Sequence, residues 1–336
     1  MTAKDSLLAA QPPLPTYPLI DTHTHFDAPV FDADRALQAQ QAYAQGVQHL
    51  VLVGYLQRHF ERLYATQKAL LAASSQACRA YPQTHIALGL HPFYIEQHTE
   101  AHLSQMAKML ECQRPLAIGE IGLDTFTDAM KQPDVFAKQQ QFFRAQLDMA
   151  VRHQLPVMLH IRKAHAEALA ILKAHDYNAH KLGGIAHSFS GGEQEAKAFA
   201  KLGFKLGVTA QITNPNAKKL RRAILAAVEH YGIECLVIET DCPDMTPMMC
   251  QISGNQALPN NASALGQNPD NEWQGAEHHN RNVPANLPWV LATLSELLKV
   301  APADLAAQLW QNSTQALQAH WSYPADNFGS STHNFH

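Results

Sequence analysis

The sequence predicts an α/β fold in which eight parallel strands alternate with helices and close into a (β/α)8 TIM barrel. Three observations lead to this fold. Short apolar runs recur along the chain, the segments between them have helical spacing, and side chains able to bind metals follow the runs. Strand and helix in repeated alternation give a parallel sheet, and eight such units can close into a barrel. An open doubly wound sheet is the structural alternative.

The apolar runs are the expected strands, because each spans four to six residues, the usual length of a buried strand. They lie at Leu19–Thr22, His49–Gly54, His85–Leu90, Leu116–Glu120, Val157–His160, Gly184–His187, Phe204–Val208 and Leu236–Glu239.

The segments between the runs carry apolar residues at helical spacing. One segment has Phe136, Phe143, Leu147 and Val151, and another has Ala196, Phe199 and Ala200, with Ser190 expected as its N-cap. Residues 288–299 and 304–320 are expected to form two closing helices.

One barrel domain is expected over residues 17–320. Residues 1–16 contain Gln-Pro-Pro-Leu-Pro and are expected to be a flexible lead-in, and residues 321–336 a polar tail. Residues 243–280 lose all periodicity after the eighth run. A loop of this length in a compact domain is often functional, so we expect it to lie over the barrel mouth as a lid.

Composition limits the class of protein. The hydrophobic content of 46% with 16% charged residues is that of a globular chain, and a net charge of -4 argues against a protein that coats nucleic acid. Five Cys without a Cys-x-x-Cys pair indicate reduced thiols and a cytoplasmic protein. Because no apolar run approaches membrane-span length, no membrane partner is expected. With no exposed apolar repeat, we expect a monomer.

His23 and His25 are two residues apart at the end of the first strand, so their side chains are expected on one face. Two neutral imidazoles on a rigid edge can bind one metal ion. With twenty His in 336 residues, about one His-x-His pair is expected by chance, so the pair needs partners elsewhere.

The other expected strands supply those partners at their C-terminal ends, where barrel enzymes place their chemistry. Strands two and seven offer none. The remaining ends offer His91 (third), Glu120 (fourth), His160 (fifth), His187 (sixth) and Asp241 (eighth). Their coincidence at separate strand ends predicts a metal centre.

Other metal-capable residues have simpler interpretations. His153, His165 and His175 fall in expected helices, where a solvated imidazole is the better interpretation. His278 and His279, in the long loop, stay ambiguous. Cys242 is either a soft ligand or a packing residue, with packing favoured.

The motifs around these residues resemble those of the TatD-type metal-dependent hydrolases, a branch of the amidohydrolase-like barrels. The resemblance spans about residues 18–320, with Asn312 and Leu317 in the closing helix. It rests on Asp21-Thr22-His23-Thr24-His25-Phe26-Asp27, Gly89-Leu90-His91-Pro92, Gly119-Glu120-Ile121-Gly122-Leu123-Asp124, Gln146-Leu147, Pro156-Val157-Met158-Leu159-His160-Ile161-Arg162, His187-Ser188-Phe189-Ser190-Gly191 and Glu239-Thr240-Asp241-Cys242-Pro243.

The resemblance implies a (β/α)8 barrel that binds two divalent metal ions, with Zn, Mn and Mg all open. It implies His23, His25, Glu120 and Asp241 around one ion and Glu120, His160 and His187 around the other, with Glu120 bridging. Related barrels can bridge with a modified Lys, but no Lys lies near this strand end. The implied activity is hydrolysis of phosphodiester bonds by a metal-activated water.

Catalytic and substrate-binding roles follow as hypotheses. Asp241 would serve as general base, and His91, which the ligand count does not require, would orient a phosphate or leaving group. Arg162 would contact phosphate as a planar fork, with an ion pair at the barrel mouth equally expected.

One segment departs from the family pattern. Relatives commonly carry a short basic segment after the Asp motif, whereas this chain has a long neutral insert that ends in His279-Asn280-Arg281-Asn282-Val283-Pro284. Arg281, Asn282 and Pro284 are the possible remnant. The departure bears on the substrate more than on the metal chemistry.

The expected function is therefore a metal-dependent DNase, for example a 3'-5' exonuclease, or an RNase. A recessed barrel mouth favours single strands or strand ends over intact duplex. A hydrolase of a small amide, ester or lactone stays open, as does a non-catalytic binding protein that retains a metal.

Overall fold

The computed structural model describes residues 14–76, 80–251 and 280–324, and within them the strands form one eight-stranded parallel sheet. The strands are β1 (Leu19–Thr24), β2 (Val47–Val53), β3 (Gln83–Leu88), β4 (Ala117–Asp124), β5 (Val157–Arg162), β6 (Ile185–Ala186), β7 (Lys205–Val208) and β8 (Leu236–Ile238). Each strand pairs with the next along the chain. This order confirms the (β/α)8 barrel and excludes a doubly wound sheet, whose strand order reverses.

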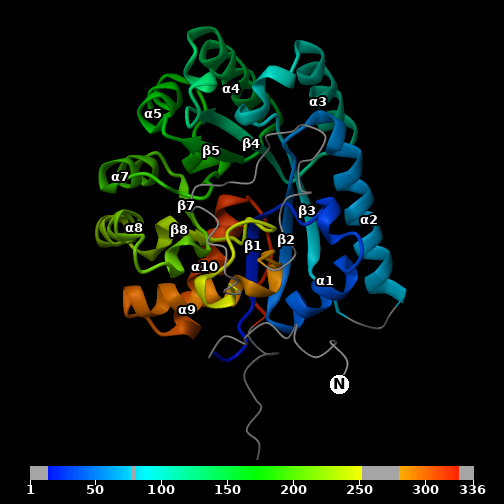
Figure 1. Cartoon of the computed structure of the whole chain (residues 1–336), viewed down its shortest axis with the longest axis vertical. Helices are drawn as coiled ribbons and strands as arrows, with labels where there is room; N and C mark the ends of the chain where they lie inside the picture. The colour runs from blue at the N-terminus through cyan, green and yellow to red at the C-terminus, as the bar shows by residue number, and fades with distance from the viewer. Residues whose placement is uncertain (1–13, 77–79, 252–279, 325–336) are drawn as a thin grey trace, which may run out of the picture.

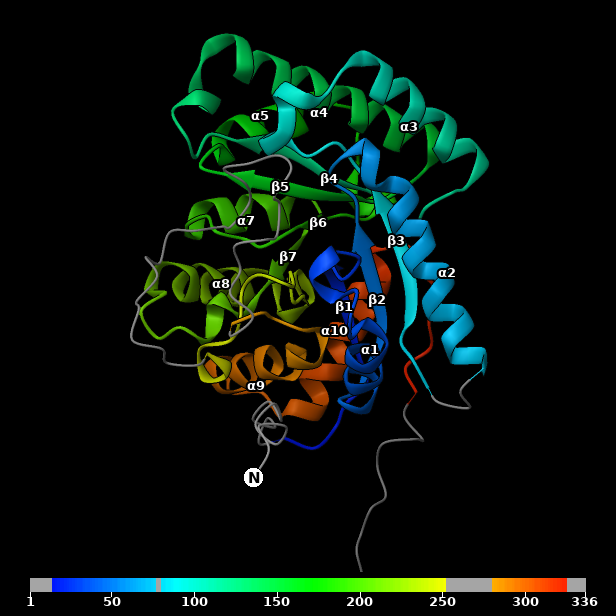
Figure 2. The same ribbon diagram turned by 45° about the vertical axis from the view of Figure 1, so that its right-hand side comes forward.

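Helices surround the strands on the outside of the barrel (Figures 1 and 2). They are α1 (Arg35–Ala44), α2 (Phe60–Gln76), α3 (Glu100–Cys112), α4 (Pro133–His153), α5 (His165–Ala174), α6 (Ala179–Leu182), α7 (Glu193–Lys201), α8 (Lys218–Tyr231), α9 (Leu287–Leu298) and α10 (Pro302–Ala316).

Two helix boundaries differ from the sequence-based expectation. Ser190 is not the N-cap of α7, which begins after Gly192, where the backbone N–H of Gly192 donates to the Glu195 carboxylate at 2.8 Å. Helix α10 ends at Ala316 rather than at residue 320, because Gln318 adopts a φ of +51°, outside the helical range.

The barrel interior is filled by one buried cluster to which seven strands contribute. Its strand members are Ile20, Val51, Val53, Ala87, Ala117, Met158, Ile185 and Val237, and it includes Trp310 of α10 and Leu317, which follows that helix. A second, larger cluster packs the outer faces of the strands against the helices. Because apolar side chains fill both sides of the sheet, buried polar side chains are placed at the ends of the strands.

Two buried glutamines on α4 hold the ends of β3 and β4. Gln146 accepts from the backbone N–H of Leu90 at 2.7 Å and donates to the Leu90 carbonyl at 3.2 Å. Gln139 makes the same pair of bonds to Asp124, at 2.8 and 2.9 Å. The two residues are two turns apart and so lie on one face of the helix. Helix α4 therefore fixes two strand ends that lead into the candidate site.

Strand β8 is joined to β1 by side chains, which brings the last strand beside the first. The Thr22 hydroxyl donates to the Ile238 carbonyl at 3.1 Å. Asp21 accepts from the backbone and hydroxyl of Thr240 at 2.9 and 2.5 Å. From α10, Asn312 donates to the carbonyls of Ile233 and Leu236, both at 2.8 Å. These bonds position the segment that carries Asp241.

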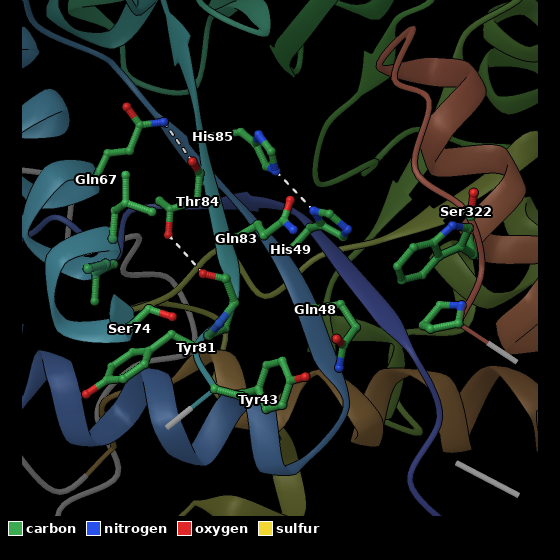
Figure 3. A pocket seen from close by; sticks show the side chains of 16 residues that line it. Tyr43, Gln48, His49, Gln67, Ser74, Tyr81, Gln83, Thr84, His85 and Ser322 are labelled. Carbon is green, nitrogen blue, oxygen red and sulfur yellow. Dashed lines mark hydrogen bonds between the residues drawn. The ribbon is translucent and has the colours of Figure 1, made fainter. Parts of the chain in front are cut away.

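A cavity of about 630 Å³ lies at the N-terminal ends of β2 and β3, away from the strand ends that carry the candidate ligands (Figure 3). His49 and His85 line it, with 3.0 Å between His49 Nδ1 and His85 Nε2. Both rings stack on Trp321. Burial lowers the pKa of His49 to about 3 and that of His85 to about 4, so both are neutral at pH 7.

Several expectations fall outside the described residues. These are the lead-in up to residue 13, the loop and lid over 252–279 with His278 and His279, and the tail from residue 325. Within the described ranges, no helix combines the length and the apolar character that crossing a bilayer requires.

Candidate metal centre

The predicted metal-capable residues meet in one place, near the C-terminal ends of the strands. Glu120, which was predicted at the end of the fourth strand, lies inside β4, because that strand continues to Asp124. Glu120 is at the centre and is buried. Its Oε1 lies 2.7 Å from His160 Nδ1, 3.2 Å from His91 Nε2 and 3.6 Å from His187 Nε2. Its Oε2 lies 3.4 Å from His23 Nε2 and 3.7 Å from His25 Nε2.

Asp241 faces Glu120 from the end of β8. Its Oδ1 lies 3.8 Å from the Nε2 atoms of both His23 and His25, and its Oδ2 lies 3.6 Å from His187 Nε2. The backbone of Asp241 has a φ of +54°, uncommon for a residue with a side chain, and its N–H donates to the His23 carbonyl at 2.9 Å. A bond to the neighbouring strand thus holds this unusual conformation and aims the carboxylate at the imidazoles.

The ligand atoms form three overlapping groups, each with all atoms within 4.8 Å of one another. They are His23, His25 and Glu120; His23, His187 and Asp241; and His91, Glu120 and His160. This differs in detail from the partition that the resemblance implies, since His187 lies equally close to Glu120 and Asp241. The end of β6 reaches between the two carboxylates, so His187 can serve either side.

Three imidazoles turn their outer nitrogen to an acceptor. His25 Nδ1 lies 3.0 Å from the Val53 carbonyl, His160 Nε2 lies 3.0 Å from Asp124 Oδ2, and His187 Nδ1 lies 2.9 Å from Glu239 Oε1. An acceptor at one ring nitrogen holds the proton there and leaves the other nitrogen a lone pair. In the His25 and His160 rings that lone pair points to the cluster, whereas the 2.9 Å contact of His187 with Glu239 is an ion pair without hydrogen-bond geometry.

His91 is arranged in the opposite sense. Its Nδ1 accepts a hydrogen bond from the backbone N–H of Phe93 at 3.0 Å, so in the neutral ring the proton is on Nε2. His91 therefore presents an N–H to the cluster rather than a lone pair. This proton position distinguishes His91 from His25 and His160, whose outer nitrogens face acceptors.

The ionisable groups of the cluster shift the pKa values of one another. Burial by itself raises the pKa of Glu120, but His91, His187 and His23 hold it well below its usual value. Burial alone lowers the pKa of His160, but Asp124 and Glu120 raise it to about 9. Burial lowers the pKa of His25 to about 3 and raises that of Asp241 well above its usual value.

Both ring nitrogens of His23 are buried without a hydrogen-bond partner. A buried polar atom without a partner costs about 1–3 kcal/mol. A cation between His23 Nε2, Glu120 and Asp241 would satisfy the Nε2 atom. The imidazole and carboxylate donors suit Zn, Mn or Mg, and the residues present therefore fit a divalent metal.

Sequence reasoning gave no role to several residues that support the site. Asp124 and Glu239 are buried carboxylates behind His160 and His187. Strands two and seven, which offer no ligand, contribute the Val53 carbonyl behind His25 and Gly207 beside Glu239. A Cβ at Gly207 would lie 2.4 Å from Glu239 Oε1, so only glycine leaves that space. Asp124 and Glu239 lie in the quoted motifs, but spacing does not distinguish a ligand from its support.

The remaining predicted residues lie at or near the barrel mouth. The Arg162 guanidinium stacks on the Phe126 ring at 3.4 Å, which leaves its phosphate role a prediction. Cys242 Sγ contacts the Thr24 hydroxyl at 2.7 Å and is fully buried, in line with the packing interpretation. Cys112, Cys235 and Cys250 are free thiols too, and Cys78 lies outside the described residues.

The described part of the segment that departs from the family pattern, residues 280–284, is hydrogen-bonded to the barrel. Arg281 donates to both carboxylate oxygens of Asp34, at 3.0 and 2.5 Å, and to the Val30 carbonyl at 2.6 Å. Asn282 donates to the carbonyls of Thr240 and Met245 at 3.0 and 3.2 Å. Arg281 and Asn282 therefore attach this segment to the barrel next to Asp241.

The family model described as TatD related DNase matches residues 20–318, nearly the whole barrel. The chain belongs to this family. A TatD-family relative from Escherichia coli K12, the uncharacterized metal-dependent hydrolase YjjV, is 35% identical over 301 residues, which cover 89% of this chain and 96% of YjjV. The crystal structure of E. coli YjjV has a TM-score of 0.69 at 32% identity, over 90% of this chain and 98% of that chain.

Another TatD-family relative carries an activity in its name. The 3'-5' ssDNA/RNA exonuclease TatD of Salmonella typhimurium is 28% identical over 229 residues, which cover 68% of this chain and 82% of that protein. Membership of this family makes the chain a metal-dependent hydrolase, as the sequence predicts, and favours the enzyme over the non-catalytic binding protein.

Proposed function

We propose that this protein is a metal-dependent nuclease that hydrolyses phosphodiester bonds at the ends of single-stranded DNA or RNA. The observation that carries the proposal is the meeting of five imidazoles and two carboxylates at one end of the barrel. The family description and the exonuclease name of the Salmonella relative support a nucleic-acid substrate.

His23, His25, Glu120 and Asp241 would hold one divalent ion, and Glu120, His160 and His187 a second, with Glu120 shared. Two such ions, when bound, lower the pKa of a water to near neutrality and neutralise charge on phosphoryl oxygens. Glu120 suits the shared role because its two oxygens face different imidazoles. Its Oε1 faces His160 and its Oε2 faces His23.

The chain's own residues supply the remaining steps. Asp241 is placed to take a proton from the attacking water and to pass it to the leaving oxygen, because one carboxylate oxygen faces the His23 side and the other faces His187. His91 donates its Nε2–H to a phosphoryl or leaving oxygen, in line with the proton position set by Phe93. Arg162, held on Phe126, contacts a neighbouring phosphate.

The test is an assay of 5'-labelled single-stranded oligonucleotides with added Mn²⁺, Mg²⁺ or Zn²⁺. We expect stepwise shortening from the 3' end that stops when EDTA is added. An H91A variant is expected to keep its metal and lose turnover. Metal-loaded wild-type protein that leaves DNA and RNA oligonucleotides intact would overturn the proposal.

A second candidate is hydrolysis of a small amide, ester or lactone at the same metal centre. The bonds of the basic residues near the mouth favour this second function, because an arginine that is bonded within the protein is less available to bind phosphate. Arg35 donates to three backbone carbonyls, and Arg62 donates to the Asp27 carbonyl at 2.7 Å. Arg281 is likewise paired to Asp34, so these three arginines are bonded within the protein rather than available to a long phosphate backbone. A panel of small amides, esters and lactones beside the oligonucleotides separates the two functions.

A further inference from the structure

We infer that Asp124 is a positioning residue that sets which nitrogen of His160 carries the proton, and thereby makes His160 a metal ligand. The inference rests on the proposed metal use and extends it to a residue outside the ligand set. His160 lies between two carboxylates, with Nδ1 at 2.7 Å from Glu120 Oε1 and Nε2 at 3.0 Å from Asp124 Oδ2. Only Nδ1 faces the other candidate ligands.

Asp124 cannot easily turn away from this contact. Its Oδ1 accepts from the backbone N–H of Phe126 at 2.7 Å, which leaves Oδ2 to His160. Its backbone N–H and carbonyl are both bonded to the buried Gln139 of α4. Side chain and main chain are thus held at once, and the orientation of the carboxylate is determined by the fold.

The consequence concerns the tautomer of His160. A neutral imidazole has one N–H and one lone pair, and a metal needs the lone pair. An ionised carboxylate only accepts, so Asp124 keeps the proton on Nε2 and leaves the lone pair on Nδ1, towards Glu120. Carboxylates behind metal-bound histidines act in this way, and their loss commonly costs 10–100-fold in metal affinity.

Asp124→Asn is the informative change. The Phe126 N–H still requires an acceptor at the position of Oδ1, so the amide oxygen takes that place and the NH2 group faces His160. The NH2 group is a donor, and it favours a lone pair on Nε2 and the proton on Nδ1. This tautomer cannot bind a metal through Nδ1. Asp124→Ala, which imposes neither tautomer, is expected to have the smaller effect.

Glu239→Gln is the matched control, because it makes the same carboxylate-to-amide change behind His187. Glu239 Oε1 lies 2.5 Å from the Ser188 nitrogen and 2.9 Å from His187 Nδ1, and its Oε2 lies 3.3 Å from the Thr22 hydroxyl. The amide of Gln can keep its oxygen at Oε1 and place its NH2 against the hydroxyl, which can accept. Glu239→Gln therefore keeps an oxygen, and not an NH2 group, next to His187 Nδ1.

The experiment measures Zn²⁺ affinity by competition with a chromophoric chelator, on variants that melt cooperatively. We expect D124N to lose about 10–100-fold, and D124A and E239Q markedly less. In parallel, 15N NMR of histidine-labelled, Zn²⁺-loaded wild-type protein should show the His160 proton on Nε2. If D124N does not fold, D124A carries the test, and a measurable loss of affinity, smaller than the one stated for D124N, is expected.

Wild-type affinity in D124N, or in D124A where it replaces D124N, overturns the role of Asp124. Equal losses of Zn²⁺ affinity in D124N and E239Q would also overturn this role, because the cause would then be the lost negative charge and not the tautomer of His160. Failure of the wild-type protein to bind Zn²⁺, Mn²⁺ or Mg²⁺ would instead overturn the proposed function itself.

Discussion

Replacement of Gln146 by Leu should destabilise the barrel and impair catalysis while leaving the metal in place. Gln146 is buried and provides the side-chain partner of both Leu90 backbone groups, at 2.7 and 3.2 Å. A Leu of similar volume leaves both groups without that partner, each at a cost of about 1–3 kcal/mol. Allowing for the gain from burying an apolar side chain, we expect a net loss of about 2–4 kcal/mol.

That loss is a large share of a typical stability of about 5–15 kcal/mol, so it is measurable by urea denaturation at constant m-value. Because His91 follows Leu90 directly, turnover should fall too, whereas metal content should not. The control is Gln141→Leu, since Gln141 is exposed on the same helix and its side chain donates to the exposed Glu100 at 2.7 Å. If Q146L costs no more stability than Q141L, the reasoning about the Leu90 bonds is wrong.

Three further outcomes are expected. Glu120→Ala should remove bound metal and activity together while the barrel still unfolds cooperatively; metal analysis and circular dichroism check this, and full metal-dependent turnover would refute it. Chelation of the wild-type protein should abolish hydrolysis, and Mn²⁺, Mg²⁺ or Zn²⁺ should restore it, to be compared in one oligonucleotide assay. His49 has a folded-state pKa of about 3 against an unfolded value of about 6.5, so its contribution to stability is present above pH 6.5 and is lost as the pH falls towards 3. Between pH 7 and pH 4, wild-type protein should therefore lose about 3 kcal/mol more unfolding free energy than His49→Gln, as measured by urea titrations at both pH values, and equal losses would contradict the assigned pKa.

The strands were predictable because most of their residues are buried and read as apolar runs, although the first half of β3 is exposed or half-buried. The apolar runs also made the candidate ligands recognisable, because a His or Asp next to such a run differs from it in polarity. The supporting residues gave no such contrast. Asp124 is the last residue of β4 and Glu239 follows β8, and only the fold shows that both face the outer nitrogens of other residues.

Two kinds of information could not be obtained from spacing. The proton position of His91 depends on a backbone N–H two residues later, and a turn of that type has no unique sequence signature. The prediction of Ser190 as the cap of α7 was wrong, because the helix start is stabilised by a bond from a backbone N–H to Glu195 and not by the hydroxyl of Ser190. Both are local backbone arrangements determined by tertiary packing.

The residues on either side of 252–279 are bonded to each other. The Asn282 backbone N–H donates to the Pro243 carbonyl at 2.9 Å, and the Thr246 hydroxyl donates to the Asn280 carbonyl. The two ends of the insert, residues 243–246 and 280–282, are thus held together by hydrogen bonds at the barrel. The sequence between these two ends can therefore be lengthened, shortened or exchanged, by evolution or by protein engineering, while the position of Asp241 is kept. Substrate preference can then diverge among relatives independently of the chemistry that cleaves the bond.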